Sequence, residues 1–240
     1  MPIQRRFACF LSAAALGLGA ATALAQPVPP ARPFSPPKTG RIPVAILLTE
    51  NANLIDFAGP WSVFENVKVK GTKGETDEFP FETYLVGESR QPVRIDSGIT
   101  VTPQYSFDDA PTPRIIVVGA QRGSPKMKAW LQKAAANPAT DVIMSVCTGA
   151  FKLAGAGLLD GKPATTHHGY TDELAKDFPQ IQVRRGARFV QSDARTFTAG
   201  GLTSGFDLAL HVVSLYYGEP VAQQAADWLE YRSQDWRSAK

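Results

Sequence analysis

Cys147 is the residue of this sequence whose type and position most directly predict chemistry. It stands in S-V-C-T-G (145–149), where an apolar run ends and a run of small residues begins. Small neighbours permit a sharp turn from a strand into a helix, which holds a reactive atom clear of the backbone. The start of that helix would favour thiolate over thiol, and the amide of Thr148 could stabilise charge that develops on a substrate. The residues alone leave a second interpretation open, a buried cysteine without chemistry.

His167 is the residue that could serve as a base for this cysteine. It lies twenty residues after Cys147 and follows a predicted short strand, A-T-T (164–166). One interpretation is a base that pairs with the thiol; the other is a structural polar contact. The chain has three histidines and no acidic cluster beside them, so we predict no metal site and no cofactor.

The surrounding segments alternate between strands and helices. Apolar runs at 41–49, 113–120 and 140–146 predict buried strands, with further strands at 79–88 and 98–104. Helices are expected at 124–136, 148–155, 171–178, 203–218 and 220–236, and one begins near Asp56, with Pro60 in its first turn. This alternation predicts an α/β fold, a three-layer sandwich with a mainly parallel sheet and helices on both faces. Ligands of such sheets bind beyond the carboxyl ends of the strands, where Cys147 is expected.

The N-terminal segments predict export. Residues 1–25 have a positive start at Arg5 and Arg6, an apolar stretch, and A-L-A before Gln26, which is typical of a cleaved signal peptide. The apolar stretch is too short for a spanning helix, so no stable membrane anchor is expected after cleavage. Six prolines occupy residues 26–40, which predicts an extended spacer outside the packed core. We therefore expect one domain, 41–240, in the periplasm or secreted.

Composition excludes one class of partner. Cleavage would remove Arg5 and Arg6 and no acidic residue, which leaves 23 basic against 22 acidic residues. A charge this close to zero gives no electrostatic reason to bind nucleic acid or anionic membrane. Cleavage would also remove Cys9 and leave Cys147 without a disulfide partner, so it is either a buried spectator or a reactive thiol.

Four ordered stretches carry a family resemblance. They are N-L-I-D-F-A-G-P-W-S-V-F-E (53–65), R-I-I-V-V-G-A-Q-R-G (114–123), the segment V-C-T-G-A-F-K-L-A-G-A-G-L-L-D-G-K-P-A-T-T-H-H-G-Y (146–170) and T-A-G-G-L-T-S-G-F-D-L-A-L-H-V-V (198–213). Together they resemble the ThiJ/PfpI family, which has the class I glutamine-amidotransferase-like, flavodoxin-like α/β fold. The most similar branch contains isonitrile hydratase and the amidotransferase-like domains of AraC-type regulators.

The resemblance implies roles for individual residues. Cys147 would be the nucleophile, Asp56 the neighbouring acid or base, and Thr148 a contact to substrate or water. The backbone amide of Gly119 would face the cysteine and help to form an anion pocket. That pocket would also involve Ala120, Gly149 and His167, although Ala120 departs from the second glycine that is usual in the family.

The function that the resemblance implies is an exported cysteine-dependent hydro-lyase, similar to isonitrile hydratase, that adds water to a small electrophile. A homodimer is expected by analogy alone. Two alternatives remain open from the residues: an amidase, peptidase or glyoxalase-like enzyme, and a non-catalytic module that binds a ligand or senses redox state through Cys147. Whether the chain is catalytic at all is not decided by its sequence.

Overall fold

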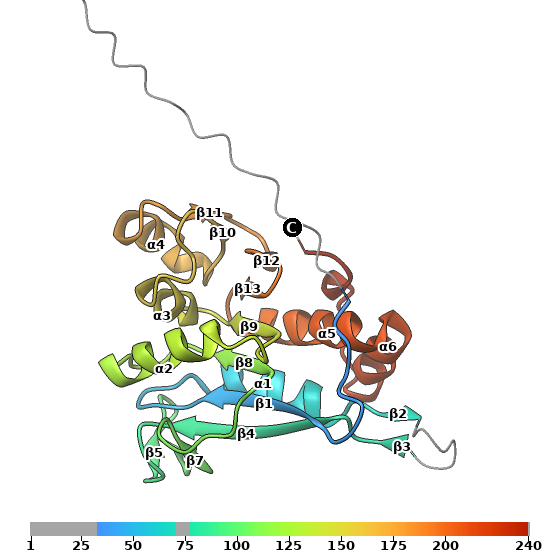
Figure 1. The fold of residues 1–240 in the computed structure, drawn as a ribbon. Helices are drawn as coiled ribbons and strands as arrows, with labels where there is room; N and C mark the ends of the chain where they lie inside the picture. Colours follow the sequence, from blue (N-terminus) through green and yellow to red (C-terminus); the bar gives the residue numbers. More distant parts are fainter. Residues whose placement is uncertain (1–32, 71–76, 240) are drawn as a thin grey trace, which may run out of the picture.

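The structure is a computed structural model that describes residues 33–70 and 77–239 (Figure 1). The predicted signal peptide, 1–25, lies outside the described residues. The strands are β1 (Ile42–Leu47), β2 (Val69–Lys70), β3 (Asp77–Glu78), β4 (Phe81–Gly87), β5 (Val93–Arg94), β6 (Thr100–Val101), β7 (Tyr105–Ser106), β8 (Ile115–Val118), β9 (Val142–Ser145), β10 (Pro163–Ala164), β11 (Gln182–Val183), β12 (Phe189–Gln191) and β13 (Thr196–Ala199). The helices are α1 (Leu54–Glu65), α2 (Pro125–Ala136), α3 (Gly149–Gly155), α4 (Thr171–Asp177), α5 (Ser204–Tyr217) and α6 (Glu219–Trp228), with 3₁₀ turns η1 (His168–Tyr170) and η2 (Asp235–Arg237).

A seven-stranded sheet forms the centre, in the order β12-β13-β9-β8-β1-β4-β7. Every neighbouring pair in it is parallel except β12 and β13, which are antiparallel. Because parallel strands present their carboxyl ends at one edge, the residues that follow β1, β8 and β9 meet there. Gly119 and Cys147 come just after β8 and β9, so the topology brings these two predicted site residues to that edge.

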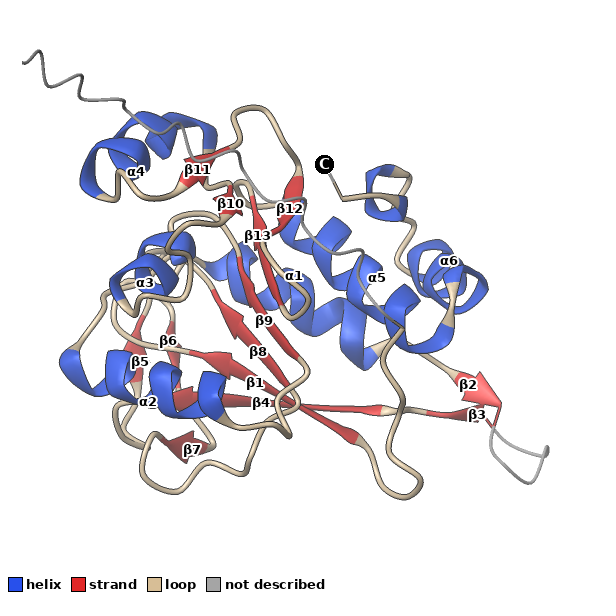
Figure 2. Cartoon of the chain, turned by 45° about the horizontal axis from the view of Figure 1, so that its top comes forward, coloured by secondary structure: helices blue, strands red, loops and turns tan. Residues whose placement is uncertain are grey.

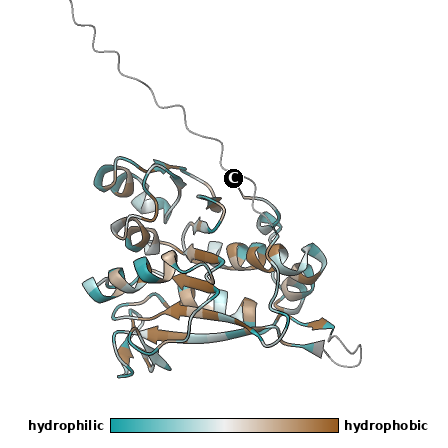
Figure 3. Cartoon of the chain, viewed as in Figure 1, coloured by the Kyte–Doolittle hydropathy of each residue, from teal (hydrophilic) through white to brown (hydrophobic). Residues whose placement is uncertain are grey.

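Side-chain alternation along the strands produces two hydrophobic layers. On β1, Ile42, Val44 and Ile46 face a core shared with α1, α5 and α6, whereas Ala45 and Leu47 face a second core shared with α2, α3 and α4. Figure 2 shows these two groups of helices on opposite faces of the sheet, and Figure 3 shows the apolar strands between them. The predicted three-layer α/β sandwich is confirmed.

Three predicted elements have different boundaries in the structure. Helix α1 begins at Leu54, because Asn53 caps it by accepting a hydrogen bond from the Ile55 N–H, so Pro60 lies inside the helix rather than in its first turn. The last helix ends at Trp228 rather than near 236, because Glu230 has a left-handed backbone with φ of 52° that stops the helix. The strand expected at 98–104 is shortened to β6, which pairs with β5 outside the main sheet.

The described part of the proline-rich spacer is not free of the core, which also differs from the expectation. The N–H of Phe34 donates to the Leu215 carbonyl at 2.8 Å, and its ring packs against Tyr216 with centroids 5.2 Å apart. Proline prevents regular pairing here, but it does not prevent an aromatic side chain from covering apolar surface. Within the described ranges, no helix has the length and apolar character needed to cross a membrane.

Candidate active site around Cys147

Cys147 sits on a tight turn between β9 and α3. Its backbone has φ of 57°, a left-handed conformation that is uncommon for residues other than glycine, and its N–H donates to the Gly200 carbonyl at 2.7 Å. The Thr166 hydroxyl donates to its carbonyl at 2.9 Å. The cysteine is therefore held from both sides, and only 7% of it is exposed. The predicted strand–cysteine–helix junction is present, and its cysteine is buried.

Asp56 reaches this cysteine from α1, at the other end of the chain. It is completely buried, and its Oδ2 accepts a hydrogen bond from the Ala120 N–H at 2.9 Å. The Cys147 side chain lies close enough to this carboxyl group that each shifts the pKa of the other. Oδ1 of Asp56 is buried and has no partner with hydrogen-bond geometry among the described residues. The structure thus brings together the two residues expected to form the reacting pair, and it leaves one carboxyl oxygen available.

The proton distribution of this pair is the reverse of the expectation of a resting thiolate. Burial raises the pKa of the Asp56 carboxyl to about 6, an effect that the Ala120 N–H and the Cys147 side chain partly oppose. Burial, together with the negative charge of Asp56, raises the pKa of the Cys147 thiol to about 12. Near neutral pH the pair therefore holds a carboxylate and a thiol. Helix α3 has only seven residues, and its start does not offset this burial.

Two backbone amides favour negative charge on the pair. The N–H of Thr148 lowers the pKa of Cys147, and the N–H of Leu202 lowers the pKa of both Cys147 and Asp56. Thr148 is half-buried and is the N-cap residue of α3, but its side chain makes no capping hydrogen bond, and the contact of its hydroxyl to substrate or water stays a prediction. Leu202 was not predicted. Its role depends on a left-handed backbone, with φ of 53°, which the glycine-rich sequence around it only indirectly suggests.

The predicted anion pocket is built differently from the expectation. The Ala120 N–H is occupied by Asp56, and the Gly149 N–H donates to the Val146 carbonyl at 3.0 Å, so neither amide is free to bind a substrate anion. Gly149 and Gly119 permit close packing of the backbone at this edge of the sheet. A Cβ atom on Gly149 would overlap the carbonyl of Val118, and one on Gly119 would lie 2.8 Å from the Asp56 Cβ.

His167 lies in the neighbouring loop, and no hydrogen bond joins its ring to Cys147 among the described residues. Its Nδ1 accepts from the Gly169 N–H at 3.2 Å, and a Cβ atom on Gly201 would collide with the ring. It lines a pocket of about 330 Å³ together with Thr166, His168, Gly186, Ala187, Arg188 and Gly200–Ser204. The role of His167 as a base stays a prediction, whereas its contact with the loop beside Cys147 is observed.

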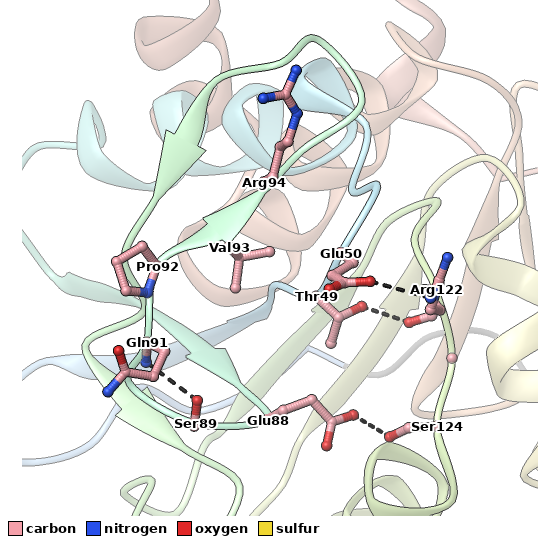
Figure 4. A pocket seen from close by; sticks show the side chains of 11 residues that line it. Thr49, Glu50, Glu88, Ser89, Gln91, Pro92, Val93, Arg94, Arg122 and Ser124 are labelled. Carbon is pink, nitrogen blue, oxygen red and sulfur yellow. Dashed lines mark hydrogen bonds and ion pairs between the residues drawn. The ribbon is translucent and has the colours of Figure 1, made fainter.

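A second pocket, of about 340 Å³, also lies near the carboxyl edge of the sheet (Figure 4). Figure 4 shows that Glu50 and Arg122 pair across it and that the Ser124 hydroxyl donates to Glu88. None of the predicted site residues lines it. In the described part of the chain, no group of three or more His, Cys, Asp or Glu side chains could hold a metal ion.

Comparison with known proteins gives relatives of two kinds. The chain is 30% identical over 194 residues to isonitrile hydratase of Pseudomonas putida, with 78% of each chain covered. It is also 27% identical over 192 residues to the HTH-type transcriptional regulator GbdR of Pseudomonas aeruginosa, of which it spans half the length. These relatives agree on the domain and differ in function.

Solved structures give the same fold. A ThiJ/PfpI family protein from Pseudomonas syringae superimposes with a TM-score of 0.66 at 25% identity, covering 92% of this chain and 83% of that one. Drosophila melanogaster DJ-1β gives a TM-score of 0.63 at 16% identity over 80% of this chain and all of that one, which is a likeness of fold alone. The model of the DJ-1/PfpI family matches residues 43–215, which include the Asp56–Cys147 pair, all of the second core and most of the first, and the chain belongs to this family.

Proposed function

We propose that this protein is a cysteine-dependent hydratase that adds water to a small electrophile of the isonitrile type. The observation that carries the proposal is the contact of the Cys147 thiol with a buried carboxyl group whose pKa is raised to about 6. A carboxylate with this pKa is a stronger base than an ordinary one, and it can return the proton near neutral pH. The similarity to isonitrile hydratase supports the substrate class.

The reaction begins with a proton transfer from the Cys147 thiol to the Asp56 carboxylate. Sulfur then bonds to the terminal carbon of R–N≡C while Asp56 delivers the proton to that carbon, which gives the thioimidate R–N=CH–S. Water adds to the same carbon and a proton reaches nitrogen. The C–S bond breaks, sulfur regains its proton, and R–NH–CHO leaves. The sum is one isonitrile and one water per formamide, with no oxidation or reduction.

The remaining groups of the site suit these steps. The N–H groups of Thr148 and Leu202 favour negative charge on sulfur, so they would lower the cost of forming thiolate when substrate is bound. The buried Oδ1 of Asp56 has no hydrogen-bond partner among the described residues and would orient the attacking water. The hydroxyl of Thr148, which makes no capping bond to α3, would serve the same purpose.

The test is turnover of benzyl isonitrile, measured as N-benzylformamide by mass spectrometry. We expect formation of the formamide by the unchanged protein, and a loss of at least about a thousandfold in Cys147→Ala and in Asp56→Asn. Glu173→Gln, an exposed change in α4, is the control and should keep its activity. Turnover that survives Cys147→Ala would refute the mechanism.

The alternative functions have less support from the site. An amidase or peptidase needs a base that hydrogen-bonds the thiol, and the ring of His167 forms its hydrogen bond with Gly169 instead. Redox sensing through Cys147 requires an accessible thiolate, but this thiol is 7% exposed and burial raises its pKa. Ready oxidation by mild peroxide, without turnover of any substrate, would favour the sensor.

We extend the proposal to location and assembly. Export is supported by the arginines, apolar stretch and A-L-A site of residues 1–25, and the mature protein would then act in the periplasm or outside the cell. A near-neutral mature chain supports a small-molecule substrate rather than nucleic acid. A homodimer remains an analogy with relatives of this fold.

A further inference from the structure

The loop that contains Leu202 supplies an amide to the reacting pair, and its conformation needs an explanation. Leu202 has φ of 53°, a left-handed conformation that is unfavourable for a residue with a Cβ atom. A backbone held in an unfavourable region must be fixed by its surroundings. Gly200 anchors one side of the loop, because its carbonyl accepts the Cys147 N–H. Helix α5 begins at Ser204 and anchors the other side.

Between these anchors, the ring of His167 packs directly on Gly201. An added Cβ atom at 201 would collide with the Cδ2 edge of the imidazole and would lie 3.1 Å from Nε2. Only glycine therefore allows the ring to come so close to the backbone. The pocket of about 330 Å³ lies beside this ring, so the loop has space to relax if the ring is removed.

The hydrogen bonding of His167 argues against a role as a base. The Gly169 N–H donates to Nδ1, so Nδ1 carries no proton and its lone pair is used. A neutral imidazole in this state has its proton on Nε2 and has no second lone pair to offer. The ring is oriented by its own loop, with His168 stacked on it at 4.4 Å between ring centroids, and this rigid orientation suits packing.

We propose that His167 is a positioning residue: its ring, wedged against Gly201, holds the Leu202 N–H over the Cys147–Asp56 pair. The inference concerns the reacting pair of the proposed function, but it does not depend on which substrate that pair transforms. It replaces the expected direct proton transfer between His167 and Cys147 with an indirect action through the loop.

The test follows the titration of Asp56, which reports the Leu202 amide directly. The carboxyl carbon is observed by NMR in protein with ¹³C-labelled aspartate, and its resonance is assigned by its absence in Asp56→Asn. Displacement of the Leu202 N–H should raise the pKa of Asp56 in His167→Ala and in His167→Asn, because this N–H favours the charged form of the carboxyl group. The other groups that act on the carboxyl group, which are the Ala120 N–H and the side chains of Cys147 and Asp96, are not substituted in these variants.

Two further variants separate a wedge from other roles. His167→Phe keeps a ring against Gly201 but cannot exchange a proton, and it should leave the titration of Asp56 unchanged. Glu173→Gln, an exposed change in α4, is the control and should also leave it unchanged. An unshifted titration in His167→Ala and His167→Asn, or a shift in His167→Phe as large as in His167→Ala, would overturn the proposal. Because no turnover is measured, a failure of the hydratase proposal would not affect this result.

Discussion

Asp56 is a carboxyl group that the fold removes from water completely. Burial favours its protonated form, and among the residues that the structure describes only the Ala120 N–H has hydrogen-bond geometry toward its carboxyl group. Since the pKa is raised from 3.8 to about 6, the folded state binds this proton more tightly than the unfolded state does. Stability from this residue is therefore present below pH 3.8 and is lost as the pH rises toward 6. Asp56, which the proposed reaction needs, therefore lowers the stability of the folded state at neutral pH.

Asp56→Asn should accordingly stabilise the protein in a pH-dependent way. The amide cannot ionise, so at pH 8 the variant avoids a cost that the shift of about two pKa units sets at about 3 kcal/mol. At pH 4 the carboxyl group is protonated and the two proteins should have similar stabilities. Urea unfolding at both pH values measures the difference. An equal effect at pH 4 and pH 8, or a loss of stability at pH 8, would contradict this account.

For individual residues, the sequence predicts a site residue only where neighbouring residues or the family resemblance indicate it. The turn at Cys147 follows from the small residues beside it, and the position of Asp56 follows from the resemblance. The proton order of the pair could not be predicted, because it depends on burial by residues distant in the chain. The amide of Leu202 could not be predicted either, since a positive φ at a leucine is imposed by tertiary contacts rather than by propensity.

Helix α6 ends in a motif that explains why it is shorter than its pattern predicts. The N–H of Tyr231 donates to the Ala226 carbonyl at 2.9 Å and the N–H of Glu230 to that of Asp227 at 3.1 Å, which is the Schellman arrangement. Glu230 therefore occupies the left-handed position where glycine is preferred. The amphipathic pattern continues into the next residues, but the chain turns there instead.

Glu230→Gly should stabilise this helix end. Glycine removes the strain of the left-handed backbone, and its greater freedom in the unfolded chain offsets part of the gain, so about 0.5–1 kcal/mol is expected. Thermal unfolding would show a midpoint higher by about 1–3 °C. Glu230→Ala is the matched control, because it removes the exposed side chain but keeps the strain. A lower midpoint in Glu230→Gly, or an equal rise in both variants, would sink this explanation.

The strands that helices cover on both faces of the sheet are well predicted. The apolar runs of β1, β8 and β9 and the helices that follow them are found as expected, because hydrophobic periodicity dominates there. The start of α1 is missed because Pro60 was taken as a first-turn signal, whereas Asn53 provides the cap. Pro60 lacks the N–H that would bond to the carbonyl of Asp56, and the helix tolerates this loss in its interior.

On the scale of the whole molecule, the polypeptide folds both of its described ends onto α5. Phe34 bonds to Leu215 and packs on Tyr216 at one place. At another, Trp236 is fully buried, and its carbonyl lies 3.0 Å from Nδ1 of His211. Of the two tryptophans near the C-terminus, Trp236 covers the core, whereas Trp228 is 65% exposed.

The mature chain should need the second half of its proline-rich spacer for full stability. A protein that begins at Gln26, the form expected after export, keeps Phe34, whereas one that begins at Arg41 loses its ring contacts and the bond from Arg114 to the Ser35 carbonyl. We expect the shorter chain to be less stable by about 1–2 kcal/mol in urea unfolding. Phe34→Ala in the longer chain should reproduce most of this loss.

Equal stability of the chains that begin at Gln26 and Arg41 would show that Phe34 contributes nothing. The export proposal is checked on the same preparation. The intact mass of protein recovered from the periplasm should lack residues 1–25.

The attachment of both ends to α5 has a mechanical consequence. This helix is continuous from Ser204 to Tyr217, and the loop just before it carries the amide that serves the sulfur and the carboxyl group. Tension applied at Phe34 would be transmitted to the C-terminal end of this helix, and tension applied at Trp236 would reach it through His211. A tether or a fused domain at either side would therefore act on the same helix.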